Sequence, residues 1–263
     1  MRLYLELAKK SFQRQVAYRS ATLAGFATNL FFGMLRAAVL IAVFGGRANL
    51  AGYSVADAIT YTGLTQALIG ATALWGWYDM VRSIKSGEVA SDLSKPFDYY
   101  GFWLAQDVGR SLYQLLARGV TIMIAYALIF GVSTPGSIGQ WALTLLSVAL
   151  AMLISFGWRF LVSTTAFWVV DAIGFVRMAY FLVLFPSGFL VPLDFMPGWL
   201  QALCRATPFP GFVDTPVTIY LGHARDGAAA GLIALQIAWL VVLVGLGRLV
   251  AEAGRRKLTI QGG

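Results

Sequence analysis

Apolar positions along the chain gather into runs that are long enough to cross a bilayer. Residues 58–78 and 227–247 are uncharged throughout, and a transmembrane helix needs about 20 predominantly apolar residues. Other apolar runs with few charges complete the set, so the predicted spans cover residues 21–44, 58–78, 108–130, 140–168, 172–191 and 227–247. We therefore expect an all-α polytopic membrane protein with six transmembrane helices, forming a single domain over residues 1–263.

The first 20 residues have a different pattern. Leu5, Ala8, Phe12 and Val16 recur at helical spacing among five basic residues, which is typical of an amphipathic helix lying on a membrane surface. The charged stretch is too long for a secretory signal peptide. We expect residues 1–20 to form an interfacial helix on the inner leaflet.

Two longer segments lie outside the predicted spans. Residues 79–107, the central polar segment, form the most polar stretch of the chain, and Gly87 and Pro96 break their helical pattern. Residues 192–226 contain five prolines, which exclude one continuous helix. We expect the first segment to lie in water and the second to form a re-entrant or interfacial extracytoplasmic hairpin before the last span.

The distribution of basic residues predicts the topology. Fifteen of the 20 lysines and arginines lie in the termini, around the central polar segment and near the turn between the fourth and fifth spans. The opposite side holds only Arg47, Arg205 and Arg225. Because cytoplasmic loops carry the excess of Lys and Arg, both termini and the central polar segment are expected in the cytoplasm.

Four arginines, Arg36, Arg118, Arg159 and Arg177, fall in or beside the predicted spans. The last three lie near inner ends, where long side chains reach lipid phosphates. Arg36 lies deeper, so we expect it to pair with a polar group in the bundle or to face an aqueous cavity. A proton or sodium relay would need carboxylates, which these spans lack.

Composition excludes most enzyme classes. Of the chain, 59% is hydrophobic and 12% is charged. The single cysteine, Cys204, and the single histidine, His223, exclude an internal disulfide and a Cys/His metal site. No nucleophile and base pair lies at membrane depth, so we expect neither an enzyme nor a metal in this chain.

Apolar and charged positions are interspersed in the central polar segment. Ile84, Val89 and Leu93 follow one another at spacings of five and four beside charges such as Arg82 and Glu88. Such an apolar series favours docking on a soluble partner. The alternative is an ordinary solvated loop between helices.

Two runs of this sequence resemble the ABC-2 type transporter permeases. SIKSGEVASDLSKPFDYYGFWLAQDVGR is similar to the family's cytoplasmic segment between the second and third spans, and its matching positions are Ile84, Gly87, Val89, Leu93 and Pro96. FLVPLDFMPGWLQALCRATPFPGFVDTPVTIYLG is similar to the family's extracytoplasmic hairpin, with matches at Pro192, Asp194, Pro197, Trp199, Leu200, Pro208 and Pro210. The likeness covers essentially the whole chain and is closest to the small permeases of the DUF990 type.

This resemblance implies a permease subunit of an ATP-driven exporter in the bacterial cytoplasmic membrane. It implies two copies of a separate ABC ATPase that would hold ATP and Mg, a second permease chain, identical or homologous, surrounding membrane lipids and no nucleic acid. The sequence contains no G-x-x-x-x-G-K-[ST] phosphate loop. The implied substrate is a hydrophobic or amphiphilic compound, drug-like, an organic cation or lipid-like, moved out of the cytoplasm or inner leaflet.

The resemblance also implies roles for particular residues. Residues 82–98, with Arg82 and Glu88 beside the matched positions, would form the coupling helix that enters the ATPase. A pathway between two permeases would be lined by Arg36, Gln66, Trp75, Tyr180, Phe181 and Phe185, whose alternative role is packing or lipid contact. Two other functions stay open: a self-sufficient secondary transporter or channel, and a membrane anchor without transport.

Overall fold

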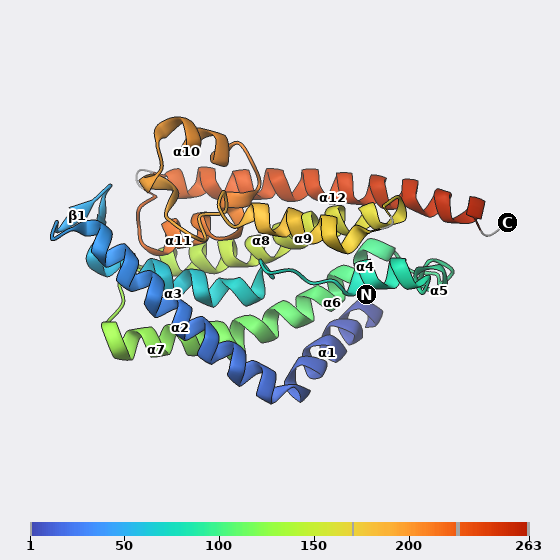
Figure 1. Ribbon diagram of the computed structural model, residues 1–263, viewed down its shortest axis with the longest axis horizontal. Coiled ribbons are helices and arrows are strands. Elements are labelled where there is room, and N and C mark those ends of the chain that lie inside the picture. Colours follow the sequence, from blue (N-terminus) through green and yellow to red (C-terminus); the bar gives the residue numbers. More distant parts are fainter. Residues whose placement is uncertain (1, 170, 225–226, 262–263) are drawn as a thin grey trace.

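The computed structural model describes residues 2–169, 171–224 and 227–261. Almost every element in these ranges is a helix, and the long helices run along the long axis of an elongated bundle (Figure 1). At one end of the bundle, β1 (Asn49–Leu50) and β2 (Tyr53–Ser54) pair as an antiparallel hairpin. This hairpin was not predicted, because two-residue strands leave no period in the sequence.

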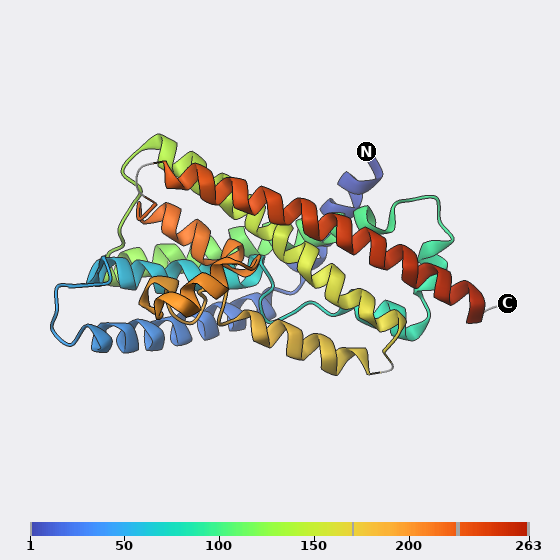
Figure 2. The same ribbon diagram turned by 90° about the horizontal axis from the view of Figure 1, so that it is seen from above.

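Four stretches among the described residues are long and apolar enough to cross a membrane: Ser20–Phe44, Tyr99–Phe130, Ile138–Phe167 and Ala228–Lys257. They correspond to α2 (Arg19–Phe44), α6 (Tyr99–Gln114) continued by a π-helical turn (Leu115–Gly119) and α7 (Val120–Phe130), α8 (Ile138–Ser163) with a 3₁₀ turn (Thr164–Phe167), and α12 (Ala228–Gln261). Helices α8 and α12 pack closely together and cross in Figure 2. The all-α class of the prediction agrees with this architecture.

The second predicted span contains a shorter helix than expected. Helix α3 (Val55–Ala71) ends seven residues before Tyr78. Just beyond its end, Ala73 and Gly76 have φ angles of 48° and 98°, a left-handed conformation that a helix cannot contain. Residues 72–78 are as uncharged as those before them, so hydropathy did not reveal the end of the helix.

The fifth predicted span is also shortened. Helix α9 (Ala172–Val183) has 12 residues, whereas residues 172–191 were expected. Pro186 follows three positions after its end; it has no N–H to donate, and its ring would clash with the carbonyl of Leu182 in a continuing helix. The six-span topology therefore stays a prediction.

The third predicted span begins earlier, at Tyr99 instead of Val108. The Asp98 side chain caps the new start by accepting a 3.0 Å hydrogen bond from the N–H of Gly101. The added turns of α6 pack along α1 (Arg2–Ala17) (Figure 1). The contact is so close that a Cβ at Gly109 would lie 2.0 Å from the carbonyl oxygen of Ala8.

Prolines divide the predicted extracytoplasmic hairpin into short elements. They are two 3₁₀ turns (Leu193–Phe195 and Phe209–Phe212) and the helices α10 (Gly198–Arg205) and α11 (Asp214–Tyr220). The main hydrophobic core joins this segment to the bundle, since Phe212 packs in one cluster with Tyr61 and Ile154. The re-entrant placement in a membrane stays a prediction.

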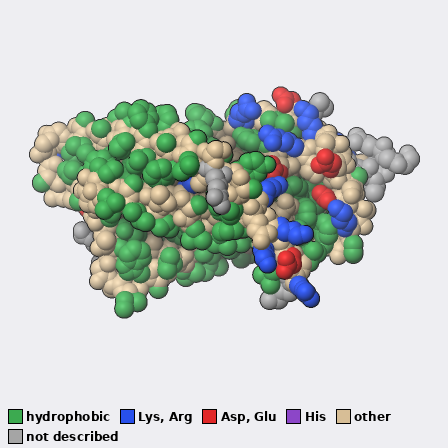
Figure 3. All heavy atoms as spheres, turned by 90° about the horizontal axis from the view of Figure 1, so that it is seen from below, with side chains coloured by type: hydrophobic (Ala, Val, Ile, Leu, Met, Phe, Trp, Pro, Cys, Tyr) green, Lys and Arg blue, Asp and Glu red, His purple; other side chains and the backbone are tan. Residues whose placement is uncertain are grey.

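Charged side chains gather at one end of the bundle. On the face drawn in Figure 3, Lys, Arg, Asp and Glu are concentrated in the half that carries α4 (Asp79–Ser86), α5 (Val89–Leu93) and the C-terminal end of α12. The other half of this face is largely apolar. The central polar segment therefore lies at the charged end and the β-hairpin at the opposite one.

Candidate functional site: the central polar segment and a buried ionic network

A tight turn divides the central polar segment into two helices. Gly87 has φ 81°, and nothing lies within 4 Å of the place where its Cβ would be. Its N–H donates to the carbonyl oxygen of Ile84 (3.2 Å) and ends α4, in a left-handed cap that favours glycine. Arg82 and Glu88 lie exposed near this turn, and Pro96 is exposed in the link to α6.

The apolar residues of this segment face the protein's own interior. Ile84 and Val89 are buried, at 7% and 0% exposure, and pack in one cluster with Trp103 and Phe167. Leu93 is half-buried against the same cluster. The prediction that this apolar series docks on a partner was therefore wrong about these side chains, because intramolecular packing explains their spacing.

What the segment presents to solvent is charged. A cavity of about 430 Å³ opens between α1 and α4, and its lining includes Arg14, Arg82 and Glu88. Arg14 of α1 forms a 3.1 Å ion pair with Asp79 at the start of α4. Any partner that approaches here meets exposed charges.

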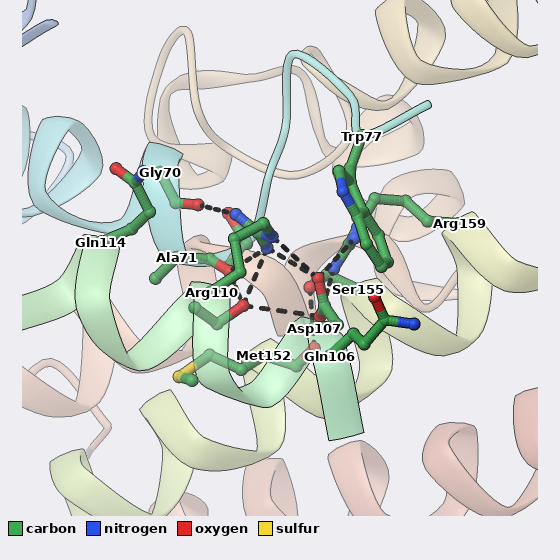
Figure 4. A network of polar contacts seen from close by, with 12 residues as sticks. Gly70, Ala71, Trp77, Gln106, Asp107, Arg110, Gln114, Met152, Ser155 and Arg159 are labelled. Atoms are coloured by element: carbon green, nitrogen blue, oxygen red, sulfur yellow. Dashed lines mark hydrogen bonds and ion pairs between the residues drawn. The ribbon is translucent and has the colours of Figure 1, made fainter. Parts of the chain in front are cut away.

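At the C-terminal edge of this segment lies a buried ionic network formed by Asp107, Arg110 and Arg159 (Figure 4). One oxygen of Asp107, Oδ1, accepts from Arg110 Nη2 at 2.8 Å and from Arg159 Nη1 at 3.0 Å. The other, Oδ2, accepts from Arg159 Nη2 at 2.8 Å. All three side chains are at most 8% exposed, so the carboxylate holds two guanidinium groups in a protein interior.

The same network ends α3. Arg110 Nη1 donates to the carbonyl oxygen of Gly70 (2.8 Å), and the Ser111 hydroxyl donates to that of Ala71 (2.7 Å). The last carbonyls of a helix have no partner within it, so these contacts satisfy the end of α3 inside the protein. The network thus joins α3, α6 and α8 at the C-terminal edge of the central polar segment.

Sequence reasoning missed this site. Asp107 was assigned to the edge of a solvated segment and Arg159 to lipid phosphates, whereas the structure pairs them 52 positions apart in sequence. One signal was present, since Asp107, Arg110 and Ser111 occupy i, i+3 and i+4 of a helix with no other charged residue and so share one face. A charged pair on such a face points to the bundle interior.

Arg36 meets one of the two expectations, because polar groups of the bundle surround it. Its Nη1 donates to the Thr65 hydroxyl at 3.0 Å, and its Nη2 donates to the carbonyl oxygens of Phe189 and Leu190. The guanidinium also lies 4.5 Å from the centre of the Phe189 ring. Arg36 therefore holds the irregular turn that follows α9.

The other candidate pathway residues do not share one surface. Gln66 and Tyr180 are buried, at 3% exposure each, and the Tyr180 hydroxyl donates to the carbonyl oxygen of Trp77 at 3.4 Å. Trp75, Phe181 and Phe185 are exposed. The buried pair contributes to packing, and only the exposed three are placed to meet a substrate or a lipid.

Asp194 organises the hairpin residues that the sequence singled out. Its carboxylate accepts from Gln201 Nε2 (2.7 Å), Arg205 Nη2 (2.8 Å) and the Tyr53 hydroxyl (3.2 Å). Pro197 precedes the first turn of α10, Trp199 is 71% exposed, and Pro192 leads into the turn that contains Asp194. Asp194 thus ties the β-hairpin to α10.

The single histidine and the single cysteine, His223 and Cys204, pack against other side chains of the protein or lie buried in it. The His223 ring stacks on Tyr53 with 4.3 Å between centroids, and its Nε2 lies 3.7 Å from Asp57 Oδ2. Cys204 is buried. In the part of the chain that the structure describes, no three His, Cys, Asp or Glu side chains are grouped so that they could hold a metal ion.

Asp214, at the start of α11, is a buried carboxyl group in the hairpin. Burial is the main cause that raises its pKa, to about 7, and the N–H of Leu193 donates a 3.3 Å hydrogen bond to its Oδ1. An unfolded chain would lose this proton near pH 4. Between these pH values the folded state binds a proton that the unfolded state does not.

We therefore expect the stability of the protein to fall as the pH rises from about 4 to about 7. Asp214→Asn keeps the acceptor for Leu193 and removes the titration, so the variant should resist unfolding at pH 8 better than the parent by a few kcal/mol. Thermal unfolding in detergent between pH 5 and 8 measures this, with Glu6→Gln as an exposed control. Equal pH profiles for parent and Asp214→Asn would contradict the expectation.

A family model described as ABC-2 family transporter protein matches residues 31–262, from within α2 to the C-terminus. No curated protein matches the sequence.

Proposed function

The chain belongs to the ABC-2 transporter family, and from this premise we propose that it is the permease subunit of an ABC exporter. Members of this family are membrane transport components and not themselves enzymes. We assign ATP hydrolysis to two copies of a separate ATPase, which would hold ATP and Mg, and pair this chain with a second permease. The proposed cargo is a hydrophobic or amphiphilic compound moved out of the cytoplasm or inner leaflet.

One observation carries the proposal: an exposed charged segment rests directly on a buried ionic network. Residues 72–78 connect α4 to the end of α3, which Arg110 caps. Residues 94–98 connect α5 to α6, which supplies Asp107 and Arg110. A displacement of α4 and α5 would therefore be passed to α3 and α6, and through Arg159 to α8.

The ATPase dimer would supply the movement that is passed to the bundle. ATP binding favours a closed ATPase dimer, and a docked segment that moves with the dimer biases the bundle toward one of its states. A segment that was loosely attached would absorb the movement. Burial of Ile84 and Val89 in the protein's own core makes α4 and α5 a firm attachment.

The test is purification of the tagged chain from native membranes in mild detergent. We expect an ABC ATPase to co-purify with the parent and to be lost from the double charge reversal Arg82→Glu/Glu88→Arg, because both side chains are exposed and the fold should survive. Arg47→Glu, an exposed reversal in the loop after α2 near the β-hairpin, is the matched control. Leu93 is unsuitable for this test, since its side chain packs on the protein's own core.

Two outcomes would contradict the proposal. One is ATPase capture that is unchanged by the double reversal. The other is a chain that purifies alone and, in vesicles, carries out flux driven by an ion gradient, which would favour a self-sufficient secondary transporter or channel. A chain without an ATPase and without flux would instead point to a membrane anchor.

A further inference from the structure

Two long helices that follow one another in the chain are separated by an apolar groove. The stretch Tyr99–Phe130 runs toward the turn at residues 131–137, and α8 runs back from this turn and packs on α6. Between them lies a cavity of about 470 Å³. One wall includes Leu116 and Met123, and the other includes Leu145 and Val148.

The floor of the groove belongs to other elements. Ala67 and Leu68 of α3 and Val217 of α11 line it, and their side chains are only 5%, 3% and 1% exposed. A second cavity of about 330 Å³ shares Leu145 and Val148 with the first, and its lining includes Asp107 of the ionic network. The two cavities therefore lie next to each other along α8, and the larger one is the groove between the two long helices.

The groove opens toward hydrocarbon. Both walls belong to stretches that are apolar and long enough to cross a membrane, and the rim residues Leu116, Ile124 and Leu145 are 56%, 54% and 64% exposed. Almost all of the lining is apolar, and water in such a space finds few hydrogen-bond partners. The medium available to fill the groove is the bilayer itself.

The size of the groove selects among the components of a bilayer. An apolar cavity of about 150 Å³ binds benzene, so the larger cavity, roughly three times that size, has room for roughly 18 carbons. A helix is about 10–12 Å wide, and one lying along the wall from Leu115 to Ala127 would need several turns of that width. The volume therefore fits a single alkyl chain and not a helix of a second copy.

We propose that this groove binds one acyl chain of a bilayer phospholipid. The chain lies between the two walls with its end over Ala67 and Val217. Because the groove is formed within one copy of the protein, this binding does not depend on the ATPase or on the proposed transport.

The test uses the full chain in nanodiscs that contain phosphatidylglycerol with a diazirine near the end of one acyl chain. After illumination, peptide mapping should find label on the floor residues Ala67, Leu68 and Val217, which annular lipid does not reach. Ala127→Trp places a large side chain in the groove from an exposed position. It should lower floor labelling roughly tenfold, whereas Ala27→Trp, an exposed alanine of α2, should leave it unchanged.

Three results would overturn the proposal. Label confined to the exposed rim in the parent would show that no acyl chain enters. Floor labelling that survives Ala127→Trp would place the chain elsewhere. Cross-links between the groove and a second copy of the protein, with an unlabelled floor, would identify a protein helix as the occupant. A failed ATPase capture would leave all three readouts unaffected.

Discussion

Replacing Asp107 with asparagine is expected to lower the free energy of unfolding by about 3–5 kcal/mol, because it leaves two buried guanidinium groups without a counter-charge. The amide keeps the shape of the carboxyl group, so the loss of unfolding free energy is due to the missing charge and not to a change in side-chain volume. Arg110 and Arg159 would remain at 8% and 4% side-chain exposure, where water cannot replace the missing carboxylate. Thermal unfolding of the detergent-purified protein measures the change.

Asp79→Asn is the matched control for this prediction. It removes a carboxylate from an Asp–Arg pair of the same region, but Arg14 and Asp79 are 48% and 37% exposed, so the expected change is below about 1 kcal/mol. Similar small losses in both variants would show that the network does not hold the bundle together. We also expect Asp107→Asn to weaken the cap on α3, which amide hydrogen exchange near Ala71 would detect.

The parts of this fold that were predictable are those with a local cause. The predicted spans at residues 21–44 and 140–168 agree with the bounds of α2 and of α8 with its 3₁₀ turn to within a few residues, since a largely apolar run long enough to cross a membrane needs no information from elsewhere in the chain. The proline-rich stretch after Pro186 was expected to be broken for an equally local reason. Such features depend on the residues that carry them and on their immediate neighbours.

The position at which α3 ends could not be predicted from the residues around it. Residues 72–78 read as membrane-buried sequence, and the helix stops at Ala71 where Arg110 and Ser111, about 40 positions later, satisfy its last carbonyls. For the same reason Arg159 was taken for a lipid-facing side chain, because its partner Asp107 lies on another helix. A hydropathy profile averages over neighbouring residues in the sequence. It therefore cannot identify a partner that tertiary packing brings in from elsewhere in the chain.

In the central polar segment the sequence pattern was recognised, but the surface that its apolar side chains contact was predicted wrongly. Its apolar series was correctly seen as non-random, but Ile84 and Val89 face Trp103 and Phe167 of the same chain. An amphipathic pattern states that one face is covered and does not say by what. The charged face, with Arg82 and Glu88, is the part left for a partner.

Gly109→Val is expected to separate α1 from α6. A Cβ at this position would lie 2.0 Å from the Ala8 carbonyl oxygen and 3.0 Å from the Phe12 nitrogen, and both are backbone atoms that no rotamer change can move aside. Ser11, buried at 6% exposure and donating to the Gln106 carbonyl oxygen at 2.6 Å, reports the contact. In a Cys204→Ser background, a Ser11→Cys thiol should react with maleimide roughly tenfold faster when Gly109→Val is added, which corresponds to about 1.4 kcal/mol of lost docking.

Gly245→Val provides the comparison, because nothing lies within 4 Å of a Cβ at this position of α12. It introduces the same β-branched residue into a helix and should leave the reactivity of the Ser11→Cys thiol unchanged. Equal reactivity in both glycine variants would mean that α1 is held by its apolar face on the membrane and not by α6. Accelerated labelling in Gly109→Val alone would establish that the amphipathic helix is held against α6 at the point where Gly109 meets Ala8 and Phe12.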